Sequence, residues 1–304
     1  IFGFSRGAFA ARRLAGLINT AGIVSRLHTD RARDGFDLYY NRPHEGAPED
    51  KKAEHVEAAK QFRMLYGKGD RNPDGTRRKT ADVPPIQFLG VFDTVAQRGL
   101  GDVLASLTPW HDKNKFKFKN YRVSPNVVNA RHAVAIDESR LGFPVLLWDG
   151  VDDDNSRFGR QAYAQRWFVG RHGDVGGGEG SKLAAAALKW MAEGARDAGL
   201  RFYATHGDDS SPLDDALRDE GMCFDADMSR TTFLDGLNPM NYPWRNRKVW
   251  YKRDKPQLQD LESYFDVTVM ERIQADHLRP RYRPPGLGPF RGVMKNWRQA
   301  PPPT

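Results

Sequence analysis

The sequence contains a single cysteine, Cys223, among its 304 residues. One cysteine excludes an intrachain disulfide and a zinc site built from several cysteines. Long apolar runs are missing as well: FPVLLW and LAAAAL are among the longest, and a membrane-spanning helix needs about 18 such residues. The chain begins at Ile1, and IFGFS does not resemble a secretory signal peptide. We therefore interpret the sequence as a fragment whose natural start is missing, with neither a signal peptide nor a transmembrane segment.

The composition is that of a folded protein with an excess of positive charge. Hydrophobic residues make up 39% and charged residues 28%, so a disordered chain, collagen and a coiled coil fit the composition poorly. The net charge of +8 favours anionic partners, and much of it lies in residues 63–79 and 111–122. Each of these runs is also explained by a solvated loop. Nucleic acid is not an expected partner, because no RRM, OB or helix-turn-helix signature is present.

Apolar segments of strand length alternate with amphipathic helical patterns, which predicts an α/β fold with a mostly parallel sheet and helices on both faces. Polar insertions interrupt this pattern, most of all over residues 205–260. We predict a catalytic domain over 1–203, an insertion and the end of that domain over 204–285, and a proline-rich tail over 286–304. The predicted strands are 1–4, 86–92, 143–148 and 165–170, and the predicted helices are 8–18, 125–138 (opened by Ser124-Pro125), 182–198 (capped by Ser181 and ended by Gly199) and 266–273.

The pentapeptide Gly3-Phe4-Ser5-Arg6-Gly7 has the G-x-S-x-G form and lies between a predicted strand and a predicted helix. In that context the serine occupies a strained turn, and glycines on both sides let the backbone pass close by. The N–H of Arg6, at the positive end of the helix, can help to stabilise an oxyanion. A pattern with only three fixed positions also occurs by chance. The prediction that Ser5 is a nucleophile therefore depends on the predicted strand before it and the predicted helix after it.

Two further polar residues follow predicted strands. Asp93 ends the apolar run 86–92, and His172 comes shortly after 165–170, in a loop with glycines at 176–178. Taken alone, Asp93 could cap the next segment and His172 could be a structural histidine. Together with Ser5 they give the chain order Ser, Asp, His, which is the order of the α/β-hydrolases. The sequence therefore predicts a catalytic triad.

Several blocks of the sequence resemble one family, the α/β-hydrolase catalytic domain of type VI secretion phospholipase effectors. They are GFSRGAFAAR (3–12), GVFDTV (90–95), ARHAVAIDESRLGFPVLLW (130–148) and WFVGRHGDVGGG (167–178), and they cover residues 1–203 in order. The resemblance implies that Ser5 is the nucleophile, His172 the general base and acid, and Asp93 the triad acid. Asp174 is the alternative acid, and Asp266 falls where the family often has a second histidine.

The resemblance implies a serine hydrolase that cleaves acyl esters of phospholipids and serves as an antibacterial effector. Such a protein is made in the bacterial cytoplasm and is secreted into target cells. The membrane surface is its substrate, and secretion-apparatus and immunity proteins are its partners. No cofactor and no metal are expected. Other lipid or small-ester hydrolases of the same fold, and an inactive module that binds anionic surfaces, remain alternatives. Family members also carry a region before the serine that supplies a second oxyanion donor, so we expect the sheet to be incomplete at its N-terminal side.

Overall fold

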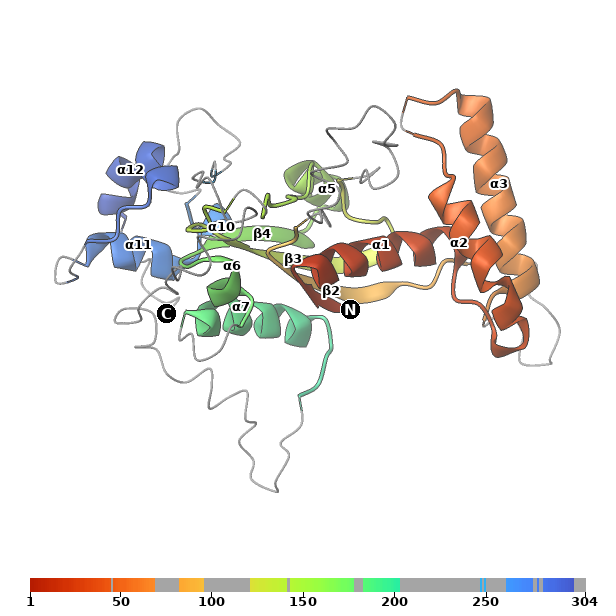
Figure 1. The fold of residues 1–304 in the computed structure, drawn as a ribbon, viewed down its shortest axis with the longest axis horizontal. Helices are drawn as coiled ribbons and strands as arrows, with labels where there is room; N and C mark the ends of the chain where they lie inside the picture. The colour runs from red at the N-terminus through yellow and green to blue at the C-terminus, as the bar shows by residue number, and fades with distance from the viewer. Residues whose placement is uncertain are drawn as a thin grey trace, which may run out of the picture.

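A four-stranded parallel sheet forms the centre of the computed structural model, with the strands in the order β1-β2-β3-β4 (Figure 1). β1 pairs with β2 so that Phe4 lies beside Phe92, β2 pairs with β3 so that Phe92 lies beside Ala133, and β3 pairs with β4 so that Ala135 lies beside Phe168. All four carboxyl ends therefore lie at one edge of the sheet. The strands span Phe2–Phe4 (β1), Ile86–Phe92 (β2), Val127–Ala135 (β3) and Tyr163–Phe168 (β4).

The structure describes residues 1–44, 46–68, 82–95, 121–140, 143–177, 183–202, 247, 249, 261–275, 278 and 281–297. Most of the predicted insertion, together with Gly178 and Ser181, lies outside these residues. The helices are α1 (Arg6–Ala21), η1 (Arg26–Arg31), α2 (Ala32–Tyr40), α3 (Glu49–Tyr66), α5 (Val151–Phe158), α6 (His172–Val175), α7 (Ala184–Asp197), α10 (Leu261–Tyr264), α11 (Val267–Gln274), η4 (Pro285–Phe290) and α12 (Arg291–Lys295).

Helices cover both faces of the sheet, as the sequence predicted. On one face the small residues of α1 (Ala8, Ala11 and Ala15) pack against Leu89 and Val91 of β2. On the other face α7 packs Ala187, Trp190 and Met191 against Phe88, Ala133 and Phe168. Figure 1 shows α5 and α7 on opposite sides of the sheet, with α2 and α3 at the far end of the molecule from α11 and α12. Burial on both faces gives β2 its near-continuous apolar sequence.

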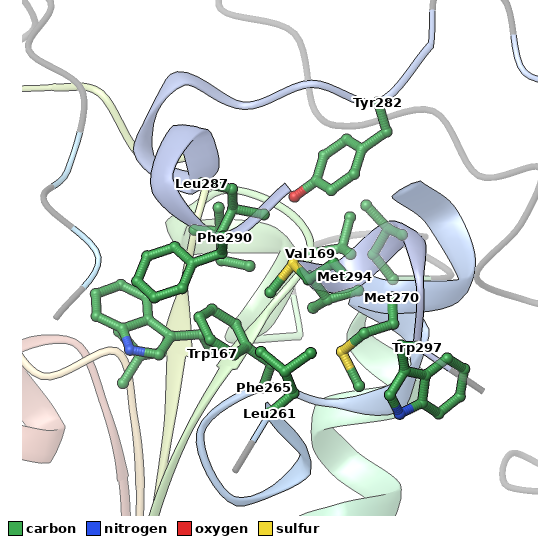
Figure 2. Packing of buried hydrophobic residues seen from close by; sticks show 14 residues of the cluster. Trp167, Val169, Leu261, Phe265, Met270, Tyr282, Leu287, Phe290, Met294 and Trp297 are labelled. Carbon is green, nitrogen blue, oxygen red and sulfur yellow. The ribbon is translucent and has the colours of Figure 1, made fainter. Parts of the chain in front are cut away.

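A third apolar cluster joins the C-terminal helices to the sheet (Figure 2). Trp167 of β4 forms a parallel bridge with Phe265, which follows α10. Leu287 in η4, Met294 in α12 and Trp297 are buried in the same cluster. The segment that composition describes as a proline-rich tail thus buries apolar side chains as far as Trp297. The domain boundaries drawn from the sequence stay a prediction.

One predicted helix is wrong. Residues 127–135 form strand β3, in the middle of the sheet, and not a helix opened by Ser124-Pro125. The Ser124 carbonyl accepts the N–H of Val127 at 2.9 Å, so this dipeptide makes a turn that leads into a strand. Residues 143–148, predicted as a strand, have only an isolated antiparallel bridge between Val95 and Val145.

The remaining predicted elements that fall on described residues are confirmed. The strands at 1–4, 86–92 and 165–170 correspond to β1, β2 and β4, and the helices at 8–18, 182–198 and 266–273 correspond to α1, α7 and α11. Gly199, with φ of 91°, follows the end of α7 and its N–H bonds the Arg196 carbonyl, as expected of a glycine that terminates a helix. Within the described ranges, we find no helix with the length and apolar character needed to span a bilayer.

Candidate active site

Ser5 occupies the tight turn between β1 and α1. Its backbone has φ of 58° and ψ of −122°, a conformation that a residue with a side chain rarely adopts. The turn brings α1 back against β1 so closely that a Cβ on Gly3 would lie 2.4 Å from the carbonyl oxygen of Gly7. A glycine is therefore required at position 3. A Cβ on Gly7 would meet nothing within 4 Å, so the expectation that both flanking glycines are needed for close packing holds only for the first.

Asp93 is the first residue after β2, at the edge of the sheet where the strands end. Its φ is 40°, so the two polar residues that follow neighbouring strands, Ser5 and Asp93, both have left-handed backbones. The N–H of Asp93 donates to the Ala133 carbonyl at 2.7 Å, which continues the ladder to β3 for one residue beyond the strand. The Asp93 side chain is completely buried.

His172 begins the short helix α6, which follows β4 and packs beside β3 and α7. Its ring lies between two aromatic rings, with centroids 4.6 Å from Phe4 and 4.9 Å from Phe143. The Phe4 ring in turn occupies the space where a Cβ on Gly176 would stand, so the glycine loop packs tightly here. The backbone N–H of His172 donates to Glu138 Oε2 at 3.3 Å. The two rings and the backbone hydrogen bond restrict the movement of the imidazole.

The three side chains form one chain of hydrogen bonds. Ser5 Oγ is 2.8 Å from His172 Nε2, and His172 Nδ1 is 2.5 Å from Asp93 Oδ2. Because an ionised carboxylate can only accept, the shared proton belongs to Nδ1, which leaves Nε2 to accept the serine hydroxyl. This is the arrangement in which a histidine can take a proton from a serine nucleophile. Ser5 and His172, which are 167 positions apart in the sequence, thus meet at one edge of the sheet.

An arginine that the sequence analysis did not single out completes the surroundings of Asp93. Arg247 Nη1 donates to Asp93 Oδ1 at 2.5 Å and Nη2 to Oδ2 at 2.9 Å. Burial alone would raise the pKa of the Asp93 carboxyl, but the charge of Arg247 and hydrogen bonds from His172 and Arg247 outweigh it and hold that pKa well below its usual range. Asp93 therefore stays ionised although it is fully buried. No local pattern marks Arg247, which lies 154 residues from Asp93.

Asp174, the alternative acid, faces the backbone and not the imidazole nitrogen. Its Oδ2 accepts the N–H of Arg171 at 2.8 Å, as part of a capping box that begins α6. Arg6 is the first residue of α1, where the N–H groups have no acceptor within the helix and the helix dipole is positive. Asp266 caps α11 by accepting the N–H of Thr268 at 3.1 Å, which is a structural use of the position.

His132 is a buried, hydrogen-bonded core residue, as the sequence indicated, although it stands on a strand and not on a helix. Its Nδ1 lies 2.9 Å from Gln165 Oε1, and its Nε2 accepts the N–H of Thr94 at 3.2 Å. Burial lowers its pKa to about 3, so it is neutral at ordinary pH. Among the described residues, no three His, Cys, Asp or Glu side chains are grouped to hold a metal ion.

Comparison with known proteins relates this chain to one family. The model of the family described as "T6SS, Phospholipase effector Tle1-like, catalytic domain" matches residues 1–194. An uncharacterized protein of Saccharomyces cerevisiae, YEL023C, is 26% identical over 148 residues, which are 49% of this chain and 18% of that protein. A solved structure, "Structure of the Tle1 effector bound to the VgrG spike from the Type 6 secretion system", is similar at 22% identity and a TM-score of 0.28. The match covers 60% of this chain and 25% of that one. The chain thus spans a quarter or less of either relative.

Proposed function

Since the chain belongs to the family of Tle1-like phospholipase effector catalytic domains of the type VI secretion system, we propose that it is a serine hydrolase that cleaves acyl esters of phospholipids. The observation that carries this proposal is the hydrogen-bonded chain from Ser5 through His172 to Asp93. The strained backbone at Ser5, on a strand-to-helix turn, is what the exposed nucleophile of such enzymes requires.

The proposed reaction has two steps. His172 Nε2 takes the proton of the Ser5 hydroxyl while the serine oxygen attacks the ester carbonyl, and the N–H of Arg6 donates to the developing oxyanion. The lysolipid alcohol leaves with the proton from His172, and the acyl group stays on Ser5. A water molecule then gives a proton to His172 and attacks the acyl carbon. The bond between that carbon and the Ser5 oxygen breaks, His172 returns the proton to Ser5, and the fatty acid leaves. Asp93 remains ionised throughout and holds the imidazole in the required tautomer.

The test is the release of fatty acid from phospholipid vesicles by the wild-type protein and by the variants Ser5→Ala and His172→Ala. We expect each substitution to lower the rate by at least about 10⁴-fold, because members of a triad act as a unit. Ser156→Ala and His55→Ala are matched controls: the Ser156 hydroxyl donates to the carbonyl of Asp152 within α5, and His55 lies on α3, far from the site (Figure 1). Both controls should keep wild-type activity.

A fluorophosphonate probe, which labels an activated serine, separates the alternatives. If the wild type is labelled but releases no fatty acid, the triad assignment stands and the substrate is a small ester or another lipid instead. A protein that is neither labelled nor active would favour the module that binds anionic surfaces. Loss of folding in the alanine variants is checked by their thermal unfolding.

We further propose that the protein acts as an antibacterial effector after delivery into a neighbouring cell, through partners of the secretion apparatus and with an immunity protein in the producing cell. Membership of the effector family supports this role. Competition between bacteria tests it: a donor strain that carries Ser5→Ala should lose its advantage over a recipient that lacks immunity. An unchanged advantage would contradict the role in killing.

A further inference from the structure

Arg247 makes a two-pronged contact with the carboxylate of Asp93. Nη1 donates to Oδ1 and Nη2 to Oδ2, at 2.5 and 2.9 Å. The same two nitrogens donate to the carbonyls of Ala135, at 3.0 Å, and Phe143, at 2.8 Å. The guanidinium is thus anchored to the end of β3 and to the segment that carries Phe143 as well as to the acid. A guanidinium in this geometry fixes both the position and the plane of a carboxylate.

The contacts around Asp93 are divided evenly between its two oxygens. Oδ1 accepts from Arg247 and from the N–H of Ala135 at 3.0 Å, and Oδ2 accepts from Arg247 and from His172 Nδ1. A carboxylate has about four acceptor positions, so all are used. Without the fork, the carboxylate could turn about its Cβ–Cγ bond and carry Oδ2 away from the imidazole. Ala135 alone would not prevent that rotation.

The charges of this pair cancel within the buried part of the site. Asp93 is fully buried and Arg247 is 9% exposed. A lone carboxylate at this place would attract a positive charge on the neighbouring imidazole and would hold a proton there. With the guanidinium present, a proton on the imidazole meets a pair of zero net charge. The guanidinium therefore offsets the attraction that the Asp93 carboxylate exerts on a proton of the imidazole.

We propose that Arg247 is a positioning residue of the hydrolase, which holds the Asp93 carboxylate in the plane that serves His172 and offsets the charge of Asp93 beside the imidazole. This inference rests on the proposed function, because it assigns Arg247 a part in the same reaction. Arg247 acts on His172 through Asp93, and through the segment of Phe143, whose ring lies 4.9 Å from the imidazole.

Other charged groups face the pair, and they determine how a pH dependence is read. Glu138, after β3, accepts the N–H of His172 and is paired with Arg140 at 2.8 Å, and its pKa is lowered despite burial. Asp137 bonds Gly170 and Tyr282, and burial raises its pKa to about 6. The further groups are His132 of β3, which is neutral, and Asp174 of α6. Asp137 is the group whose titration could be mistaken for that of the triad.

The experiment compares pH profiles of kcat/KM for the wild type, Arg247→Gln and Arg247→Lys. We use "acid limb" for the pH range over which kcat/KM falls as the solution is made more acidic. Glutamine removes the charge of Arg247, so we expect the acid limb to move up by about one pH unit or more. We also expect kcat to fall about 10- to 100-fold. Lysine keeps the charge and loses the fork, so the limb should stay near its wild-type place while kcat falls. A residue with only a structural role would lower the amount of folded protein without moving the limb.

Arg12→Gln is the matched control. Arg12 is a buried arginine of α1 that donates to the carbonyls of Leu146 and Leu147, in the segment that Arg247 also anchors, but not to Asp93. Its loss should destabilise the protein and leave the acid limb in place. Asp137→Asn is the second control, because an amide oxygen can still accept from Gly170 and Tyr282. If the wild-type limb disappears in Asp137→Asn, the limb does not report on the triad and the inference is overturned.

The rate of fluorophosphonate labelling at each pH gives a second readout that does not depend on the lipid. If the wild type is labelled and the acid limb of Arg247→Gln lies at the same pH as that of the wild type, the inference is overturned and the proposed function stands. If the wild type is not labelled, both are overturned. If Arg247→Gln does not fold, Arg247→Lys still decides, because a wild-type kcat in that variant would contradict a positioning role for the fork.

Discussion

At the scale of single residues, two members of the proposed triad carry unfavourable backbone conformations. Ser5 has φ of 58° and Asp93 has φ of 40°, and neither is glycine. Each such residue costs on the order of 1–3 kcal/mol, which the surrounding structure must offset. Two contacts across the sheet do so: Ser5 N–H donates to the Phe92 carbonyl at 3.0 Å, and Asp93 N–H donates to the Ala133 carbonyl. The two strained residues are therefore ones whose backbones position side chains of the proposed triad.

The two glycines beside Ser5 should respond in opposite ways to alanine. Gly3→Ala places a methyl group 2.4 Å from the Gly7 carbonyl, so α1 must move, and we expect the free energy of unfolding to fall by about 2 kcal/mol or more, with loss of activity. Gly7→Ala fills open space within α1 and should raise that free energy by about 0.5–1 kcal/mol. Urea unfolding of both variants measures the difference.

A Gly3→Ala variant as stable as the wild type would contradict the close approach of α1 to β1. Equal losses in the two variants would instead show that the site, and not packing, requires glycine at both positions. Fluorophosphonate labelling of Gly7→Ala tells whether the added methyl group hinders access to Ser5.

At the scale of elements, β3 shows why local sequence signals can mislead. Ser124-Pro125 has the form of a helix start, and the same dipeptide also suits the turn that precedes this strand. β3 is buried on both faces, so its apolar residues show neither the alternation of a half-exposed strand nor a helical period. Its partners, β2 and β4, decide its conformation, and they lie far away in the sequence. β2 was predictable because six of its seven residues are apolar or small and the run ends at a clear polar boundary.

The C-terminal elements η4 and α12 should contribute to stability as core elements. Leu287 is fully buried in the cluster of Figure 2, so Leu287→Ala should lower the free energy of unfolding by about 2–5 kcal/mol. The matched control is Gly288→Ala, since a Cβ there meets nothing within 4 Å. Thermal and urea unfolding of the two variants provide the measurement. Equal stability of Leu287→Ala and wild type would show that η4 does not pack as described.

At the scale of the whole molecule, the sequence predicted the fold class, and it singled out three polar residues that follow β1, β2 and β4, because each comes after an apolar run with a recognisable boundary. The parts it did not predict depend on contacts between distant segments. Arg247 reaches Asp93 from a polar stretch without periodicity, and the burial of Trp297 depends on a cluster that β4 completes. Nothing in the residues around either one indicates a buried partner.

From the C-terminal cluster we expect that residues 1–260 do not fold stably on their own. Ending the chain after residue 260 removes α10, α11, η4 and α12 and uncovers Trp167 and Val169. We expect the shortened protein to lose its cooperative unfolding transition and to bind a hydrophobic dye. Ending it after residue 297 keeps the whole cluster and should preserve stability. A cooperative transition in the shorter form would show that 1–260 is a complete folding unit.

The strand order equals the chain order, which has a consequence for biosynthesis. Each strand joins the edge left by the one before it, so the sheet can grow while the ribosome is still adding residues. The hydrogen-bonded chain of the site cannot form so early: His172 follows Ser5 by 167 residues, and Arg247 follows Asp93 by 154. During synthesis the sheet can therefore form before the site does, and the site is complete only after Arg247 has been made.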